Sequence, residues 1–437
     1  MDKHRDALKI SIEMSLKVIQ HHRWLMDLYV VDFFTENHWE LLPLAWRECF
    51  CDIDPQTLGY IIRDLPTNHI LPLSFLALMK VIKSLSFPRQ SVNRVESNEK
   101  QSVIGSHPKL KNLFLKHVKL KKRHEISLMA NVVHSVAVES CCDAVIDFGS
   151  GLGHLVRMLS YKYDLHTVGI EGQNQLTDEA RKLDSELEYT AQKYVDAETM
   201  RKLNRPIHCN KTLNSPSQLE KLSFSISNHG LIGLHPCGDL GPLLLKYFVS
   251  CERSKFICLV GCCYMKLTCE NGIGYPMSKY LQSLDYTLSY PSREIACHAI
   301  EVYCEKLCKG DYNDLKVHAF RAALERILVA HNPKLRHSPI RSVKHTENMT
   351  FENYCKIALE RMSLPGMDTS QAEADLSQWK RVIIVYTLRL LLAPLVETLI
   401  LLDRLYYLTE HGIYCEIHPV FDPRVSPRNH VIIGRKI

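Results

Sequence analysis

The sequence predicts a mixed α/β fold built around a parallel β-sheet, and three observations support this. Short apolar segments alternate with helical segments between residues 144 and 264, which is the pattern that parallel sheets produce. A glycine-rich turn, GSGLG, follows the first apolar segment, DAVIDF. The chain ends in the apolar segments IYCEIHP and HVIIG, which PRVSPR separates, and such a pair is typical of antiparallel strands.

The pattern along the chain predicts five parts. Residues 1–85 have apolar spacings near 3.6 and predict an N-terminal helical domain. Residues 86–108 are polar and predict a linker. The core is predicted over 109–264, with the strands DAVIDFG, LHTVGIEG, PIHCNKTL, LIGLHPCG and FICLVGCCY. A helical insertion after the fifth strand covers 265–378, and 379–437 supply a closing helix and the C-terminal strand pair of the core.

Composition and the start of the chain bear on its compartment. The chain is 46% hydrophobic with a net charge of +6, which permits an acidic partner without requiring one. The opening MDKHRDALKISIEMSLK has no apolar signal core, and a long chain with sixteen cysteines of irregular spacing is not typical of a secreted disulfide framework. We therefore expect a cytoplasmic or nuclear protein.

One apolar stretch, residues 382–402, is long enough to span a membrane. Arg389 and Glu397 lie inside it, and each would cost about 2.5 to 3.5 kcal/mol at the centre of a bilayer. A helix that leads into a strand pair of an α/β sheet also has an apolar surface to cover. The sequence favours a core helix, with membrane association through 382–402 as the alternative.

The glycine-rich turn predicts a nucleotide-type ligand. Gly149, Gly151 and Gly153 allow the backbone to turn tightly and to approach a ligand closely. In a dinucleotide motif the third glycine would stand at His154. With Asp147 before it, the spacing is DxGxGxG, the pattern of class I S-adenosylmethionine methyltransferases.

Two acids complete the predicted cofactor site for S-adenosylmethionine. Glu171 ends the next predicted strand, where a carboxylate can accept both ribose hydroxyls of a nucleoside. Asp147 is expected beside the methionine end of the cofactor and its ammonium group.

Several motifs resemble the methyltransferase-like 25 family over nearly the whole chain: DFFTENHWELLPLAW, KLKKRHE, DFGSGLGHL, GIEG, GLHPCGDL, GCCYM with PMSKYL, FRAALE, TFENY and SPRN. The resemblance implies a Rossmann-like methyltransferase that binds its cofactor through the acids and glycines named above. Lys122, His124 and Glu125 match the family's KKxHE element, which is expected to close over the cofactor. RNA is the substrate usually suggested for the family.

The predicted catalytic residues follow the fourth and fifth strands, whose carboxyl ends lie at the edge of the sheet where ligands bind. His235 and Asp239 are candidate proton acceptors, although Asp239 also suits the cap of the following helix. Tyr264 is a candidate for stacking on a base. Adenine dimethylases have an Asn or Asp, two residues and an aromatic after the fourth strand, whereas this chain has His235 to Gly238, which argues against an N6-adenine reaction.

The cysteines at the same two strand ends leave alternatives open. Cys237 with Cys262 or Cys263 is similar to enzymes that methylate carbon 5 of pyrimidines, where a thiolate attacks the ring. The acid expected before the Pro is replaced by His235. These residue types also suit zinc, but their ligand spacing is irregular, so the sequence predicts no metal.

Two basic segments, Lys109 to Arg123 and Lys334 to Lys344, contain no acidic residue and could hold phosphates of RNA. The sequence thus predicts an S-adenosylmethionine-dependent methyltransferase acting on RNA. A protein or small-molecule methyltransferase, or a scaffold that binds the cofactor without catalysis, are the alternatives.

Overall fold

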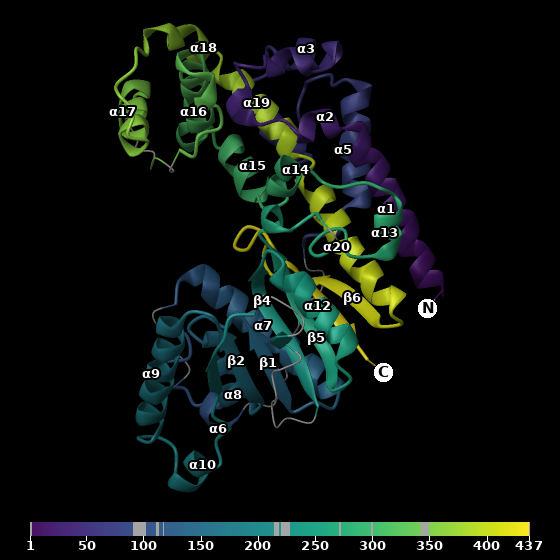
Figure 1. The fold of residues 1–437 in the computed structure, drawn as a ribbon, viewed down its shortest axis with the longest axis vertical. Helices are drawn as coiled ribbons and strands as arrows, with labels where there is room; N and C mark the ends of the chain where they lie inside the picture. Colours follow the sequence, from purple (N-terminus) through teal and green to yellow (C-terminus); the bar gives the residue numbers. More distant parts are fainter. Residues whose placement is uncertain are drawn as a thin grey trace. The chain divides into compact units, whose positions relative to one another are not determined.

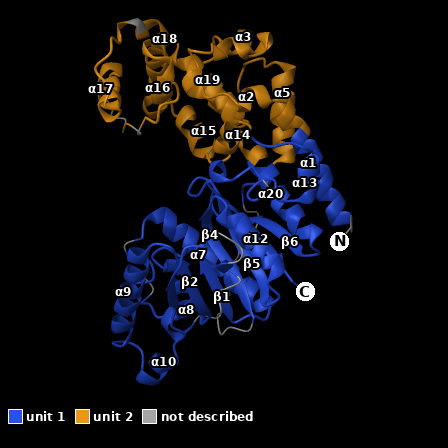
Figure 2. Ribbon diagram, in the orientation of Figure 1, with its two compact units in different colours: residues 1–16, 87–288, 397–437 blue, residues 17–86, 289–396 orange. Residues whose placement is uncertain are grey.

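The computed structural model describes residues 2–436 except 91–101, 111–112, 117, 214–217, 220–227, 271, 299, 341–342 and 344–348. Part of the predicted linker, and Lys111, Arg341 and Lys344 of the basic segments, thus lie outside the described residues. The chain forms two compact units (Figure 2). Unit 1 comprises residues 1–16, 87–288 and 397–437, and unit 2 comprises residues 17–86 and 289–396.

Unit 1 contains the sheet and the helices around it (Figure 1). Its helices are α6 (Val103–Ser106), α7 (Leu120–Glu139), α8 (His154–Tyr163), α9 (Asn174–Ala191), α10 (Ala197–Arg201), α12 (Leu240–Ser250), η3 (Tyr264–Lys266), α13 (Lys279–Ser283) and most of α1 (Asp2–His21) and α20 (Ala393–Glu410).

The sheet has seven strands in the order β3-β2-β1-β4-β5-β7-β6. They are β1 (Ala144–Phe148), β2 (His166–Glu171), β3 (Ile207–Asn210), β4 (His229–Cys237), β5 (Ser254–Cys262), β6 (Tyr414–Pro419) and β7 (His430–Arg435). Strands β1 to β5 are parallel, and β7 is antiparallel to both β5 and β6. The predicted Rossmann-like α/β fold and its C-terminal strand pair are confirmed. The strand order reverses between β1 and β4, where such sheets bind ligands.

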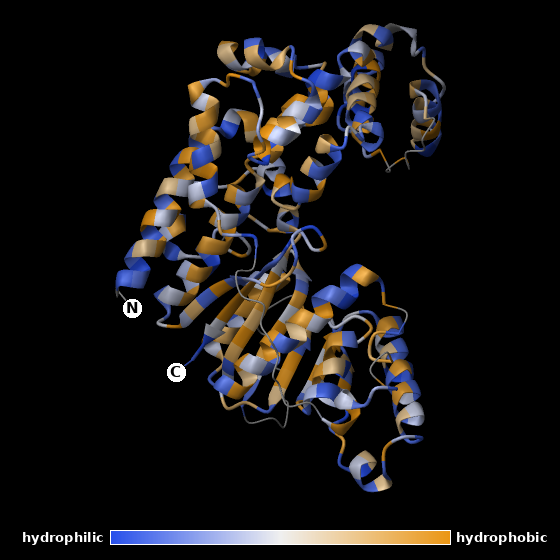
Figure 3. Cartoon of the chain, turned by 180° about the vertical axis from the view of Figure 1, so that it is seen from behind, coloured by the Kyte–Doolittle hydropathy of each residue, from blue (hydrophilic) through white to orange (hydrophobic). Residues whose placement is uncertain are grey.

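Helices cover both faces of this sheet. Phe256, Cys258 and Val260 of β5 belong to one core cluster with residues of α7 and α8. On the other face, a Cβ added to Gly434 of β7 would lie 3.1 Å from Phe248 of α12 and 3.3 Å from Leu408 of α20. Because both faces are buried, the central strands are apolar along their length rather than alternating, as their colouring in Figure 3 shows.

Unit 2 is helical and combines two distant parts of the sequence. Its helices are α2 (Arg23–Met26), η1 (Val30–Asp32), η2 (His38–Leu41), α3 (Leu44–Phe50), α4 (Pro55–Ile62), α5 (Leu73–Leu85), α14 (Tyr290–Ile295), α15 (Ile300–Cys308), α16 (Asn313–His331), η4 (Pro333–Leu335), α17 (Phe351–Arg361), η5 (Ser370–Ala372), α18 (Glu373–Ser377) and α19 (Trp379–Leu390). The Gln56 side-chain amide of α4 donates to the Cys308 carbonyl oxygen of α15 at 2.8 Å.

These boundaries differ from the predicted ones. Residues 1–85 and 265–378 were expected as separate helical parts, whereas most of both form one unit, and residues 1–16 and 265–288 belong to unit 1. The reason is physical, since helical periodicity shows which face of a helix is apolar but not which distant helix covers it.

The apolar stretch near the C-terminus forms two helices rather than the single predicted one. Residues 391 and 392 separate α19 from α20, and Pro394 is the second residue of α20, a position where proline is tolerated. Trp379–Glu410 is long and apolar enough to cross a membrane, and 94% of its apolar window is buried inside the protein. Arg389 donates to the Pro291 carbonyl oxygen at 2.8 Å, and Glu397 accepts from the Tyr264 hydroxyl at 2.9 Å, so both predicted charges have protein partners.

Candidate cofactor and active site

The glycine loop lies between β1 and α8, at the carboxyl edge of the sheet. Gly149, Gly151 and Gly153 all have left-handed backbones, with φ of 76°, 55° and 67°, a region that glycine adopts without cost. A Cβ added to Gly151 would meet nothing within 4 Å. The loop therefore borders open space at its centre, as a ligand cradle requires.

Glu171 at the end of β2 joins this loop. Its carboxylate accepts hydrogen bonds from the Gly151 amide at 2.9 Å and from the Gln173 amide at 3.0 Å. Each carboxylate oxygen can accept more than one hydrogen bond, and Glu171 is half-buried. Glu171 thus still has acceptor capacity for hydroxyl groups of a ligand.

Asp147, in β1 just before the loop, is a buried acid without a hydrogen-bond partner for its Oδ1 among the described residues. Its exposed fraction is 4%. Burial raises the pKa of Asp147 to about 7; the charge of Lys122 opposes this rise and that of Glu171 adds to it. A buried carboxylate lacking a partner is costly, so this position favours a cationic ligand group.

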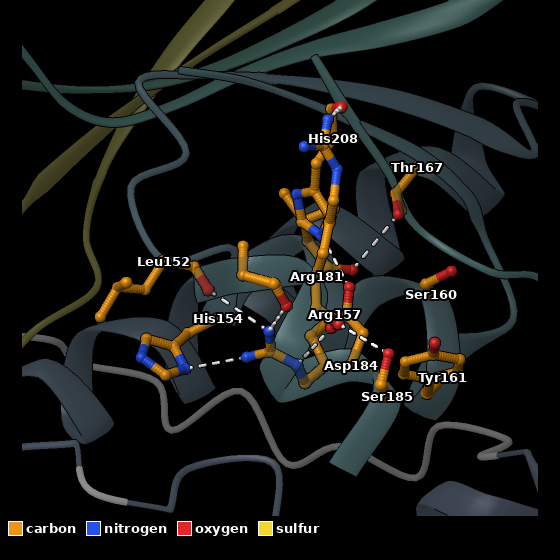
Figure 4. A network of polar contacts seen from close by, with 12 residues as sticks. Leu152, His154, Arg157, Ser160, Tyr161, Thr167, Arg181, Asp184, Ser185 and His208 are labelled. Atoms are coloured by element: carbon orange, nitrogen blue, oxygen red, sulfur yellow. Dashed lines mark hydrogen bonds and ion pairs between the residues drawn. The ribbon is translucent and has the colours of Figure 1, made fainter. Parts of the chain in front are cut away.

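A buried polar network holds the glycine loop to the neighbouring helices and strand (Figure 4). Arg157 of α8 is 2% exposed and donates through Nε to Asp184 Oδ1 of α9 at 2.5 Å. It also donates to the Leu152 carbonyl oxygen of the loop at 3.3 Å. Asp184 Oδ2 in turn lies 2.7 Å from Nε2 of His208 in β3. The network therefore ties the loop to α8, α9 and β3.

Replacing Gly153 with Ala is expected to destabilise the protein by about 2 to 5 kcal/mol. The left-handed backbone alone costs about 1 to 2 kcal/mol. The new Cβ would also lie 2.5 Å from His208 Cε1, and overpacking adds about 1 to 3 kcal/mol. The matched control is Gly412→Ala, with φ of 73° and nothing within 4 Å. Equal shifts of the two variants in chemical denaturation would contradict the proposed clash.

Glu125 of α7 connects three distant segments of unit 1. It is 1% exposed, and its Oε1 lies 2.9 Å from His235 Nε2 and accepts from the Ser426 hydroxyl at 2.7 Å. Burial alone would raise the pKa of Glu125, but the hydrogen bond and charge of His235, with Ser426 and Lys122, lower it to about 2. Glu125 is therefore a carboxylate that holds the His235 imidazole.

His235 has one ring nitrogen left for chemistry. With Nε2 at Glu125, Nδ1 is buried and has no hydrogen-bond partner among the described residues. A carboxylate that accepts the Nε2 proton leaves the lone pair on Nδ1. His235 has a left-handed φ of 68°, which is uncommon for a residue other than glycine and often marks a functional site.

The other KKxHE residues lie at the start of α7. Lys122 Nζ is 3.7 Å from Glu125 Oε2, and His124 Nε2 accepts from the Asp422 amide at 2.9 Å. The structure thus places this element beside His235 and the C-terminal loop of the core. Its contact with the cofactor stays a prediction.

The three predicted cysteines come together at the ends of β4 and β5. Cys237 Sγ lies 3.4 Å from Cys262 Sγ and 3.4 Å from Cys263 Sγ. The hydrogen bond from Cys262 is the largest cause that lowers the pKa of Cys237, to about 5, while burial opposes it. None of the sixteen cysteines forms a disulfide bond.

Two predicted catalytic residues have other roles. Tyr264 is 1% exposed and donates to Glu397, so the stacking on a base expected from the sequence is wrong for this buried ring. The Asp239 carboxylate accepts from the Thr268 amide at 2.8 Å and hydroxyl at 2.6 Å. It makes no side-chain capping bond to α12. Asp239 therefore orders the loop after β5. Its side chain neither caps α12 nor is available as a free proton acceptor.

The sequence comparisons agree with this geometry. A family model described as "Methyltransferase domain" matches residues 121–270. Residues 121–270 are thus similar to a methyltransferase domain. The matched range contains all of α7 but its first residue, the glycine loop, Glu171 and the three clustered cysteines.

Two curated relatives are similar to half of the chain. "Probable methyltransferase-like protein 25" of Mus musculus is 28% identical over 246 residues, or 51% of this chain and 40% of the relative. The protein of that name from Homo sapiens is 28% identical over 250 residues, with the same coverage. These matches confirm the resemblance to the methyltransferase-like 25 family, while the matched segment spans only 40% of the relatives' length.

Solved methyltransferase structures also align, at low similarity. The plantazolicin methyltransferase BamL in complex with a triazolic desmethylPZN analog and SAH is 14% identical, with a TM-score of 0.22, covering 64% of this chain and 85% of that chain. The methyltransferase domain of bacterial CtHen1-C is 16% identical, with a TM-score of 0.22, covering 31% of this chain and 65% of that chain.

The methyltransferase domain fits S-adenosylmethionine, the predicted cofactor. Asp147 offers its buried Oδ1, which has no partner among the described residues, to the ammonium, Glu171 offers acceptors to the ribose, and the space at Gly151 admits the ligand. When bound, this cofactor supplies an electrophilic methyl group on its sulfonium.

Affinity for S-adenosylmethionine is expected to rise with pH between about 5.5 and 7.5, by up to about tenfold per unit below the Asp147 pKa. Below its raised pKa of about 7, Asp147 holds a proton that must leave before the carboxylate can pair with the ammonium. The ammonium itself keeps its charge to about pH 8. Calorimetry at several pH values measures this. Asp147→Asn should bind more weakly with a flatter profile, and a flat profile for the unaltered protein would exclude this role of Asp147.

Sequence reasoning missed Arg157, Asp184, His208 and Ser426. Arg157 lies in HLVRMLSY, where residues 155–161 are all buried, and a charged residue on an apolar helix was the available signal. No local pattern marked the other three, because each acquires its partner from a distant segment.

Proposed function

We propose that this chain is an S-adenosylmethionine-dependent methyltransferase that acts on RNA. One observation favours RNA over an uncharged acceptor. Lys119, Lys121, Lys122 and Arg123 are all exposed at the start of α7, the helix whose Glu125 binds His235. Exposed cations that lead to a candidate proton acceptor suit a phosphate backbone.

The second basic segment contributes less to this proposal. Arg336 in unit 2 lies 3.1 Å from Asp32 and 2.7 Å from Glu36. Its charge is therefore largely neutralised within its own unit. The RNA proposal rests on the segment from Lys109 to Arg123, and an RNA-modifying role fits the expected cytoplasm or nucleus.

In the proposed reaction the chain binds and orients both substrates and moves one proton. Asp147 holds the ammonium of the cofactor, and Glu171 holds its ribose. His235 Nδ1 accepts the proton from an N–H or O–H of the acceptor as that atom takes the methyl group. Glu125 is a positioning residue that fixes the imidazole and stabilises its protonated form.

Replacing Gly151 with Asp tests the cofactor site. Asp tolerates a left-handed backbone, and nothing lies within 4 Å of the new Cβ, so the fold should persist. The side chain would fill the cradle and place a charge beside Asp147 and Glu171, lowering cofactor affinity about 10- to 100-fold. Calorimetry measures this, with the exposed Glu179→Ala as the control. Unchanged affinity in a folded Gly151→Asp protein would remove the assigned site.

The acceptor class is tested by labelling. Extract from cells that lack this protein is incubated with the purified chain and methyl-labelled cofactor, then treated with ribonuclease or protease. Label lost to ribonuclease supports the proposal. Label lost only to protease, label resistant to both treatments, or no label would contradict RNA and point to a protein, a small molecule or a non-catalytic scaffold.

Charge reversal gives a second, independent readout. Lys119→Glu combined with Lys121→Glu should weaken RNA binding and reduce the slope of log affinity against log salt by about 1 for each lost phosphate contact. Lys202→Glu is the control, because Lys202 is exposed and pairs with Glu198 in a different part of unit 1. An unchanged slope in the double variant would argue against phosphate contacts at α7.

A further inference from the structure

Three cysteine thiols meet at the carboxyl ends of two neighbouring strands. Cys237 is the last residue of β4 and pairs in register with Cys262, the last residue of β5. Cys263 follows directly, and the three sulfur atoms lie within 4.8 Å of one another. Among the described residues, no other group of three cysteines lies this close together.

Backbone distortions bring these thiols together. Neighbouring side chains in a regular strand point to opposite faces, so Cys262 and Cys263 would diverge if β5 continued. Instead Cys263 has a left-handed φ of 50°, and both thiols reach Cys237. His235, two residues before Cys237, is left-handed as well, with φ of 68°, where the β4–β5 register shifts. Each such residue costs about 1 to 2 kcal/mol, and strain of this kind concentrates at functional sites.

We propose that Cys237, Cys262 and Cys263 bind a zinc ion as three thiolate ligands. Zinc–sulfur bonds of about 2.3 Å in a tetrahedron place the sulfur atoms about 3.8 Å apart. The sulfur separations of 3.4 Å from Cys237 reach that value after shifts of a few tenths of an ångström. Three side chains on two adjacent strands therefore offer a nearly formed set of soft ligands.

The fourth position of the zinc ion is open to water or to another external ligand. Among the described residues, only these three cysteines place their ligand atoms within 4.8 Å of one another at this site, and Asp239 is held by Thr268, so these residues supply no fourth ligand in this arrangement. Cys237 is exposed while Cys262 is buried, which leaves a solvent-accessible side. Three protein ligands with one open position characterise catalytic rather than structural zinc sites.

Metal content is the direct test. The full chain is purified under reducing conditions, loaded with zinc, passed through a desalting column and analysed by plasma mass spectrometry. We expect about one zinc ion per chain. Cys237→Ser and Cys263→Ser should each lose most of it. Cys51→Ser and Cys141→Ser, which replace exposed thiols outside the cluster, should retain it. Circular dichroism verifies that each variant is folded.

Two further readouts separate this site from its alternatives. Cobalt loaded in place of zinc should give a thiolate-to-cobalt charge-transfer band that Cys237→Ser weakens. Zinc should also slow alkylation of Cys237. No bound zinc in the unaltered chain, zinc that persists in both cluster variants, or a disulfide from Cys237 to Cys262 or Cys263 in anaerobically purified protein would each overturn the proposal.

The zinc site is independent of the proposed methyltransferase activity. Cofactor affinity and metal content are measured on the same samples, so one can fail without the other. A bound zinc would also oppose the cytosine alternative, because Cys237 would then be a ligand and not a free nucleophile for ring carbon 6.

Discussion

Replacing His235 with Asn is expected to lower the turnover number of methyl transfer about 10²- to 10⁴-fold, the range that a general base contributes. Asn tolerates the left-handed φ of 68° at this position, so the backbone conformation should be retained. Its amide cannot take a proton from the acceptor. Cofactor affinity should change little, because Asp147 and Glu171 supply that site. Turnover is measured on the acceptor class that the labelling experiment identifies, and cofactor affinity by calorimetry.

Glu125→Gln separates positioning from catalysis. The amide oxygen can still accept from His235 Nε2, but the charge that stabilises an imidazolium is lost. We therefore expect a smaller fall in turnover than for His235→Asn and a pH–rate profile that is displaced, which a loss of packing alone would not produce. Full turnover in a folded His235→Asn protein would exclude His235 as the base and leave the Glu125–His235 contact a structural one.

Replacing Arg157 with Met is expected to destabilise the protein by about 3 to 5 kcal/mol, the cost of removing one partner of a buried ion pair. Arg157 is 2% exposed, and its removal leaves His208 as the side chain that still bonds the Asp184 carboxylate among the described residues. The Leu152 carbonyl oxygen of the glycine loop also loses its donor. Chemical denaturation followed by circular dichroism measures the loss, and cofactor affinity should fall with it.

The matched control for Arg157 is Lys182→Met. Lys182 pairs with Glu179 on the surface of α9, with side chains 72% and 50% exposed, and such pairs contribute about 0 to 1 kcal/mol. The double variant Arg157→Met with Asp184→Leu removes both charges and should be more stable than Arg157→Met alone. A double variant that is less stable would show that packing, and not an unpaired charge, explains the loss.

Much of the fold follows from local patterns in the sequence. The seven strands coincide with the predicted segments. The central strands β1 and β5 are buried on both faces and are therefore apolar along their length, whereas the edge strands β3 and β6 are partly exposed. The glycine loop was also predictable, since only glycine adopts the left-handed backbone there at no cost. The composition of helical unit 2 was not predictable. Residues 17–86 and 289–396 form it together through contacts that helical periodicity does not encode.

The sequence by itself determined the parallel sheet, the loop and the acids that fit S-adenosylmethionine, because these depend on residue type and short spacing. Only the tertiary structure decided which groups act together. Glu125 binds His235 across 110 positions, burial removes Tyr264 from the surface, and Thr268 occupies Asp239. The three thiols converge because β4 and β5 end in register and the backbone turns left-handed at Cys263. Hydrogen bonds, burial and ligand geometry depend on which distant segments meet in the folded chain, so local sequence patterns do not predict them.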